Sequence, residues 1–476
     1  MPNTLLLDEP FQVTGKWWLP DHSDKAVQGI LTYSPTEIEL TLIGGFADMS
    51  ADSGVASRDF ERITTIYGFA DGRKFTLQDA IIQGRTIHSN GGLTETKCSA
   101  GFVFVGSHVD KESEFRSIAI GCRHLDGFLN TPAINVRREI VEKKLRGITA
   151  ECKAPEPKSF QIDAVGSEME IRSHPNVRQD RNSATLRIES HVLFRFDTPQ
   201  CFDPCLKTSW RLCQLLTLLT DQFVKPEWLE LVPNSSEESL SVLWKVIRQR
   251  ELNIHRDDVL IHFADCENFQ TILNNWFSAS ETLMNSVYMF LASRTKADAG
   301  TDRLEPCFLM ASQAFEAFSR ATTESTYMDQ QIYDQQVAKV LKEAIPTTVG
   351  ADHRSSLKNR IRYGNELSLR KRLSNSLEEL PSELHRHVFK DAKRFTNGVV
   401  DTRNFLTHYG DDLREKALDN APLWWATEKL VMLVRILLLR HVGIKEDRIA
   451  QALDNHHFLM QHPLLWGEFE ESRSTG

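Results

Sequence analysis

The first two hundred residues alternate between apolar and polar positions, as half-buried β-strands do. Ile38, Leu40 and Leu42 alternate with polar residues, and an Asp-Gly pair inside residues 64–77 supplies the positive φ angles of a tight hairpin turn. Gly, Asp and Ser residues separate the other strand candidates, at residues 102–105, 115–120, 186–189 and 192–196. This spacing is typical of a β-sandwich or barrel.

After Pro199 the apolar residues recur three or four positions apart, which is helical spacing. The pattern predicts helices over residues 206–220, 240–250, 269–294, 303–321, 330–344, 382–407 and 423–442. The predicted fold is therefore α+β and multidomain, with a sandwich-like or barrel-like β-rich domain followed by an all-α bundle. We expect a β domain at residues 1–200, a helical connector at 201–264 and a helical domain at 265–476.

The composition is that of an ordinary globular protein, and it does not indicate a particular function. The 476 residues are 41% hydrophobic and 25% charged, with a net charge of -9, so contact with a polyanion would need a local basic patch. The first eight residues carry no basic region, and the most apolar stretch, residues 430–439, is interrupted by Arg435 and too short for a bilayer. We expect no signal peptide, no membrane contact and a cytoplasmic location.

The eight cysteines are scattered, which indicates reduced thiols more than a disulfide framework. Cys201, Cys205 and Cys213 are closer together, but their spacing matches no standard zinc motif. Cys205 and Cys213 as small apolar residues on a helix are the simpler interpretation, and metal binding stays the alternative. We expect no cofactor, since no P-loop, dinucleotide-binding fingerprint or HExxH motif is present.

A cluster of polar residues lies near the end of the helix predicted over residues 382–407. Arg403 offers a fixed fork that can hold a phosphate, and the His408 imidazole can move a proton at physiological pH. Asn404 lies four residues before His408 and can orient the imidazole or the substrate. Arg403 and His408 are about 140° apart on an ideal helix, and we expect Gly410 to loosen the last turn and bring them together. These groups suit metal-independent RNA cleavage by the ribose 2′-hydroxyl.

Arg followed by His at such a spacing is weak evidence by itself, because the chain has 16 histidines. Other pairs run from Arg248 and Arg250 to His255, from Arg256 to His262, and from Arg435 to His441. We expect Arg435 to reach the edge of its apolar helix. From the residues alone, a structural interpretation stays open, in which Arg403 pairs with Asp401 or Asp411 and His408 only ends a helix.

The Arg403-Asn404-x-x-x-His408 cluster, late in a helix of an all-α region, resembles the motif of HEPN ribonucleases. The resemblance covers residues 265–442 and implies catalytic roles for Arg403, Asn404 and His408. The metal-independent mechanism described above is expected to leave 2′,3′-cyclic phosphate and 5′-hydroxyl products. The resemblance also implies a homodimer or higher oligomer in which two motifs face one RNA. Residues 11–20, 28–31, 37–45, 66–68 and 75–77 resemble the N-terminal domain of ApeA-type proteins, which act in abortive infection against phage.

The nuclease interpretation implies an RNA substrate, and transfer RNA is a candidate for a toxin that stops translation. We expect a regulatory or sensing N-terminal domain that responds to a phage-derived trigger. Two other functions stay open: a HEPN fold kept for nucleotide binding or dimerisation without catalysis, and a sensor or scaffold whose helices only oligomerise. An intact Arg403-Asn404-His408 set favours the nuclease.

Basic residues precede the motif, with 11 Lys/Arg against 5 Asp/Glu between residues 354 and 394. These basic residues either form a solvated face of the protein or bind the phosphates of RNA. The predicted RNA-binding residues are Arg360, Arg362, Arg370, Lys371, Arg372, Lys390, Lys393 and Arg394. Glu316, on the helix predicted over residues 303–321, either faces solvent, which the pattern favours, or holds Arg403.

Overall fold

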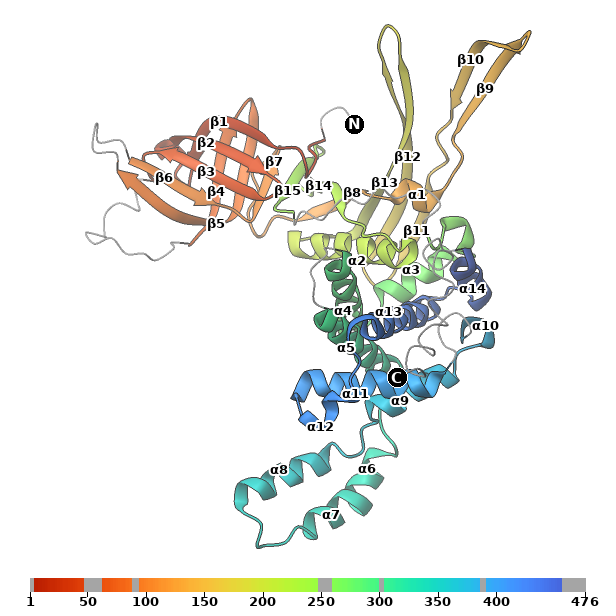
Figure 1. Cartoon of the computed structure of the whole chain (residues 1–476). Helices are drawn as coiled ribbons and strands as arrows, with labels where there is room; N and C mark the ends of the chain where they lie inside the picture. The colour runs from red at the N-terminus through yellow and green to blue at the C-terminus, as the bar shows by residue number, and fades with distance from the viewer. Residues whose placement is uncertain are drawn as a thin grey trace. The chain divides into compact units, whose positions relative to one another are not determined.

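The computed structural model describes residues 4–46, 62–87, 94–246, 259–298, 304–385 and 391–455. The chain forms two compact units, Met1–Phe277 and Ser278–Gly476. The first is mostly β and the second is helical (Figure 1). The predicted order of a β-rich region followed by helices is confirmed.

A closed barrel of six strands begins the first unit. Its strands are β1 (Phe11–Trp18), β2 (Val27–Ser34), β3 (Glu37–Ile43), β4 (Arg62–Ala70), β5 (Arg73–Ile87) and β6 (Thr94–Ser99). The barrel closes because the end of the long strand β5 pairs with β6, while residues Phe75–Gln78 of the same strand pair with β7. Trp17 is fully buried inside it and donates to the Gly29 carbonyl at 3.2 Å. The predicted Asp71-Gly72 hairpin turn is confirmed, with φ angles of 46° and 73°.

The same sheet continues from the barrel into a second β region. In sheet order its strands are β7 (Phe102–Val105), β15 (Leu240–Trp244), β14 (Pro226–Pro233), β8 (Phe115–Cys122), β13 (Ala184–Gln200), β12 (Ser167–Gln179) and β11 (Lys158–Ile162). The helices of this unit are α1 (Leu125–Leu129), α2 (Phe202–Thr220) and α3 (Phe269–Phe277). Strands β9 (Ile134–Val141) and β10 (Lys144–Cys152) form a separate two-stranded ribbon. Both this ribbon and the β12–β13 hairpin project from the unit (Figure 1).

Three predicted elements differ from the structure. The helix predicted over residues 240–250 is wrong, because β15 is a strand whose five residues are all buried. A short run that is apolar on both faces has no period, so its pattern does not separate a strand from a helix. The helix predicted over 269–294 is two helices, α3 and α4 (Glu281–Asp298), and the two strands predicted near residue 190 are one strand, β13.

The second unit is a bundle around the apolar helix α13 (Asn420–Val442), which packs against α5 (Leu304–Thr322), α4 and α11 (Ala392–His408). The remaining elements are α6 (Gln330–Ile332), a π-helical segment η5 (Tyr333–Ala338), α7 (Lys339–Glu343), α8 (Ala351–Arg362), α9 (Leu369–Glu378), α10 (Ser382–His385), α12 (Asp411–Arg414) and α14 (Glu446–Asn455). Gly443 ends α13 with a φ of 103°, as predicted.

Arg435 does not reach the edge of α13 as expected: it is 2% exposed and lies over the Phe290 ring. The predicted helix over residues 382–407 is also corrected, because α11 begins at Ala392 with Asp391 accepting from the Arg394 backbone N–H. Within the described residues, no helix has the length and apolarity needed to cross a membrane.

Candidate active site

Helix α11 presents the motif because its buried positions recur at helical spacing. Phe395, Val399 and Thr402 lie on the face that packs against α5 and α9. The buried Thr402 hydroxyl also accepts a hydrogen bond from the Leu418 backbone N–H at 2.8 Å, which fixes the segment that follows α12. Arg403, the next residue, therefore lies at the margin of the packed face, half-buried.

The Arg403 guanidinium pairs with Glu316 of α5, with 3.4 Å between Nη2 and Oε1. The two side chains are 33% and 22% exposed, so the pair is partly screened by solvent. The Glu316 oxygen is buried, yet it accepts no hydrogen bond from the described residues, so the pair is an ion pair without hydrogen-bond geometry. Of the two interpretations of Glu316, the structure supports the less favoured one, contact with Arg403. The guanidinium keeps donors available for another anion.

Arg403 forms an ion pair, but its partner is Glu316 and not the Asp401 of the structural interpretation. Asp401 pairs with Arg370 of α9 at 3.3 Å instead of with Arg403. Arg403 is therefore held by a residue 87 positions away in sequence, which no local pattern reveals.

His408 is exposed at the last position of α11, and the helix is regular as far as this residue. The expectation that Gly410 loosens the last turn is wrong: Tyr409 takes the left-handed conformation (φ 50°) and ends the helix, whereas Gly410 has a φ of -71°. Arg403 and His408 therefore stay about 140° apart around the axis. Asn404 lies about 40° from His408, on the same side of the helix. One chain thus directs its arginine and its histidine to different sides of α11.

Comparison with known proteins gives two family matches. The model for the ApeA N-terminal domain 1 matches residues 12–276, and the model for the ApeA-like HEPN domain matches residues 309–448. The chain belongs to the ApeA family. The predicted resemblance is confirmed for both halves, and the helical bundle that carries Arg403, Asn404 and His408 is the HEPN domain of this ApeA-family chain. No curated protein and no solved structure matches it.

The basic residues predicted to bind RNA differ in exposure and in contacts within the HEPN domain of this ApeA-family chain. Arg360 and Arg362 are exposed on α8, which packs on α7 and the π-helical segment. Arg370 binds Asn397 and Asp401 and so joins α9 to α11. Exposed basic positions near the motif helix remain at Lys371 and Lys393, with Arg394 half-buried beside them, and Lys390 lies outside the described residues.

The prediction that Arg372 binds RNA does not hold, because this side chain is 2% exposed. Its donors bind other groups of the protein. Its guanidinium donates to the Leu367 carbonyl at 3.0 Å, to the Ser319 hydroxyl at 3.2 Å, and to both oxygens of Ser325 at 3.3 Å. These bonds fix the segment between α5 and α9.

We expect Arg372→Ala to lower the free energy of unfolding by about 3 kcal/mol, because it leaves several buried acceptors without a donor. Lys371→Ala, at the exposed neighbouring position, should change it by less than about 0.5 kcal/mol. Urea unfolding followed by circular dichroism measures both. Equal stability of the two variants would contradict the structural role of Arg372.

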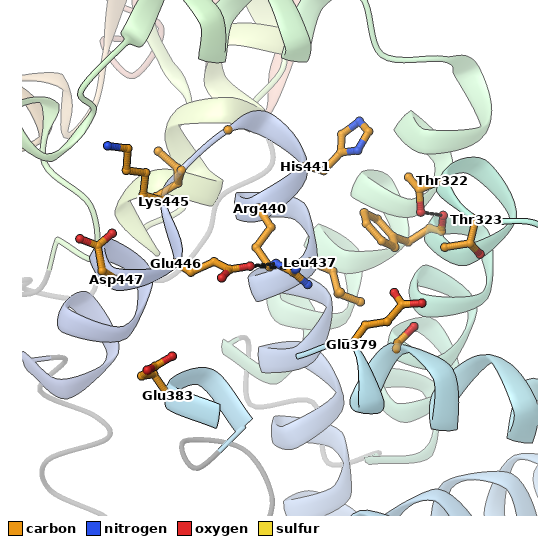
Figure 2. Close-up of a pocket in the computed structure, with 14 residues that line it drawn as sticks. Thr322, Thr323, Glu379, Glu383, Leu437, Arg440, His441, Lys445, Glu446 and Asp447 are labelled. Atoms are coloured by element: carbon orange, nitrogen blue, oxygen red, sulfur yellow. Dashed lines mark hydrogen bonds and ion pairs between the residues drawn. The ribbon is translucent and has the colours of Figure 1, made fainter. Parts of the chain in front are cut away.

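A pocket of about 900 Å³ lies elsewhere in the HEPN domain, between α5, α9, α10, α13 and α14 (Figure 2). Neither Arg403 nor His408 lines it. Arg440 pairs with Glu446 at 2.8 Å, and burial lowers the pKa of the nearby His441. The pocket is lined by four carboxylates, from Glu379, Glu383, Glu446 and Asp447, and by the cations Arg440 and Lys445. The excess of carboxylates disfavours phosphate groups, so the pocket gives no support to the nucleotide-binding alternative.

The cysteines of helix α2 fit the simpler interpretation. Cys205 and Cys213 are 0% and 1% exposed on the helix, whereas Cys201 is exposed at its N-cap. The Cys213 sulfur lies 3.7 Å from that of Cys122 on β8. Within the described ranges, no three His, Cys, Asp or Glu side chains have the arrangement of a metal site.

Proposed function

We propose that the chain is a metal-independent endoribonuclease of anti-phage defence, with Arg403, Asn404 and His408 as its catalytic residues. The observation that carries the proposal is the placement of the motif. Arg403 is half-buried and held by Glu316, while His408 is exposed at the helix end, within a domain that matches the ApeA-like HEPN model.

The chemistry of the three side chains suits cleavage by the ribose 2′-hydroxyl. His408 transfers the proton, as general base for the 2′-hydroxyl or as general acid for the leaving 5′-oxygen. Arg403 stabilises the negative charge that develops on the phosphorus-bound oxygens. Asn404 orients His408 or the phosphate. The 2′-oxygen bonds to phosphorus as the bond to the 5′-oxygen breaks, which leaves a 2′,3′-cyclic phosphate and a 5′-hydroxyl.

The divergence of Arg403 and His408 supports a site shared between two copies. A single helix directs the two groups about 140° apart, so one chain does not readily present both to the same phosphate. Two α11 helices that face each other across a twofold axis bring the arginine of one copy near the histidine of the other. This arrangement also gives the proposed RNA two sets of exposed basic residues, including Lys371 and Lys393.

The products of RNA cleavage test the proposed activity. We expect purified protein to cut RNA in the presence of EDTA and to leave 2′,3′-cyclic phosphate ends, and transfer RNA is the first substrate to try. A single 2′-deoxy substitution at the mapped cut site should abolish cleavage there, because the nucleophile is lost. Sequencing of RNA ends after induced expression identifies the cut sites. Loss of cleavage in EDTA, or products with 3′-hydroxyl ends, would contradict this mechanism.

Oligomeric state gives a separate prediction. We expect a homodimer, or a larger even-numbered oligomer, that forms through the helical unit, because a shared site needs two copies of α11. Light scattering at micromolar concentration measures the mass. A preparation that is monomeric under the conditions in which it cuts RNA would show that one chain suffices.

The proposed role of residues 1–200 is regulation, with a phage-derived molecule as the trigger. The β structure extends to Phe277, so the test removes the whole first unit, Met1–Phe277. This deletion should change toxicity or the range of phages resisted while the catalytic residues remain. Unchanged protection by the remaining chain against the same phages would remove the sensing role.

A further inference from the structure

The β9–β10 ribbon has one apolar face and one polar face. In its antiparallel register, Ile140 is opposite Leu145 and Arg138 is opposite Ile148, so alternate residues share a face. The apolar face, which we call the ribbon face, comprises Ile134, Val136, Arg138, Ile140, Leu145, Ile148, Ala150 and Cys152. Its five large apolar side chains are between 40% and 64% exposed. The other side is mostly polar, with residues such as Glu139 and Thr149, and Val141 is its large apolar residue.

The ribbon face borders a cleft in the same unit. The β12–β13 hairpin extends beyond the pairing of β12 with β11, which ends at Ile171, and beyond the pairing of β13 with β8, which ends at Val192. A cleft of about 530 Å³ is lined by Ile134 at the base of the ribbon and by Ile171 and Ile188 of the hairpin. The two projecting hairpins rise from this region (Figure 1). The cleft is thus a site of mixed apolar and polar lining at the base of the exposed ribbon.

An isolated two-stranded ribbon is at best marginally stable in water, and contiguous exposed apolar surface marks a site of interaction. The apolar residues of the ribbon face lie on one side, in register, over both strands. A solvated ribbon would be expected to carry polar residues on both sides. The sequence therefore indicates that this face is covered when the protein functions.

The charges of the ribbon face and of the cleft are opposite, which favours the cleft of a second copy as the partner surface. Arg138 is the charged residue of the ribbon face, and it is exposed. The cleft carries the exposed carboxylate of Glu156, whereas its Lys158 lies over the Phe263 ring at 4.2 Å. The Asp126 carboxyl also lines the cleft, but it hydrogen-bonds to Ser190 and its burial raises its pKa. A ribbon placed in the cleft of another copy would bury its apolar side chains against Ile188 and bring Arg138 to the Glu156 carboxylate.

The available area favours a reciprocal exchange between two copies. A two-stranded face of eight residues measures about 26 Å by 10 Å, so one ribbon in one cleft covers only about 500 Å² on its two surfaces together. A twofold exchange, in which each copy inserts its ribbon into the other's cleft, doubles this to about 1,000 Å², near the lower limit for a specific interface. A single docked peptide would gain half as much.

We propose that the ribbon face and the cleft form an interface between two copies of this chain, each inserting β9–β10 into the cleft of its partner. This contact is separate from the α11 contact of the proposed nuclease site. It links the N-terminal halves of two molecules, so a chain that uses both contacts assembles beyond a dimer.

Two double variants on opposite sides of the ribbon test this interface. Ile140→Asp with Ile148→Asp places two charges on the ribbon face, and Val141→Asp with Thr149→Asp places two charges on the other side. All four positions are exposed, so neither variant should unfold the protein, and circular dichroism checks this. Light scattering of the full chain measures the mass of each. We expect the first variant to have half the mass of the unmodified protein, and the second to keep the full mass.

A photocrosslinking residue gives a second, direct measurement. Placed at Ile148, p-benzoylphenylalanine should crosslink two differently tagged copies of the full chain in solution, whereas the same residue at Thr149 should not. Equal mass for the unmodified protein and the Ile140/Ile148 variant would overturn the proposal, and so would an equal loss in both variants. Crosslinking in cells to a different protein, without the second copy, would show that another partner occupies the cleft. None of these measurements depends on RNA cleavage.

Discussion

His408→Ala is expected to slow RNA cleavage by about 10²–10⁴-fold, the usual cost of losing a general acid or base. Arg403→Ala should have a loss of similar size, because it removes the group that stabilises the phosphorane charge. His408 is exposed at the end of α11, and Arg403 is one-third exposed, so both variants should stay folded, within about 1 kcal/mol of the original stability. Initial rates on the mapped RNA substrate measure the loss, and plaque counts measure the loss of phage defence.

Three comparisons make this result specific. His353→Ala changes an exposed histidine on α8 and should leave the rate unchanged. Asn404→Ala should be milder than either catalytic variant if the amide only orients its neighbours. Mixing the Arg403→Ala and His408→Ala chains should restore part of the activity if two copies share the site, because one mixed dimer regains one complete pair. A folded His408→Ala protein that cut RNA at the original rate would remove the central assignment.

Of the other arginine–histidine pairs, the structure describes both residues of Arg435–His441 and only the histidine of Arg256–His262. His262 lies 3.2 Å from the Gly127 carbonyl through Nδ1, and it forms a capping box with Asp265. His441 lies in the pocket of Figure 2, while Arg435 is buried beside Phe290. Arg248, Arg250, His255 and Arg256 lie outside the described residues.

The spacing of apolar residues predicted the strands and helices that have one apolar and one polar face. It did not predict elements that are apolar on both faces. Strand β3 alternates cleanly, and α5 repeats its apolar residues every three or four positions, so both were predictable. Strand β15 is buried on both sides and looked helical. Closure of the barrel was not predictable, because it depends on β5 changing partner from β7 to β6, and pairing between distant strands leaves no local pattern.

In the candidate site, too, features set by neighbouring residues were predictable, whereas contacts between residues far apart in the sequence were not. The motif on α11 was readable, since its residues are neighbours in sequence and the resemblance assigns their roles. The partners of the basic residues were not, because burial of a charge depends on what packs over it. Arg372 and Lys371 are adjacent and similar in sequence, yet one is buried among hydroxyls and carbonyls and the other is exposed.

Glu316→Ala is expected to lower the turnover rate on the order of 10-fold to 100-fold, because the Arg403 guanidinium loses the contact that orients it. Glu316 acts on the reaction through Arg403, so it is a positioning residue. The effect should appear in kcat with little change in KM, since Arg403 serves a charge that develops only in the transition state. A partly exposed ion pair contributes at most about 1 kcal/mol to folding, so the variant should remain folded.

Conservative replacements separate positioning from a merely structural role. Glu316→Asp should recover part of the rate, because it keeps the carboxylate, and Glu316→Gln should lie between Asp and Ala, because its amide keeps the shape without the charge. Glu305→Ala, at the exposed start of the same helix, serves as the control and should leave kcat unchanged. An unchanged kcat in Glu316→Ala would show that the ion pair is incidental. A raised kcat would show that the carboxylate restrains Arg403 by competing with the phosphate for its donors, and the positioning role would then be wrong.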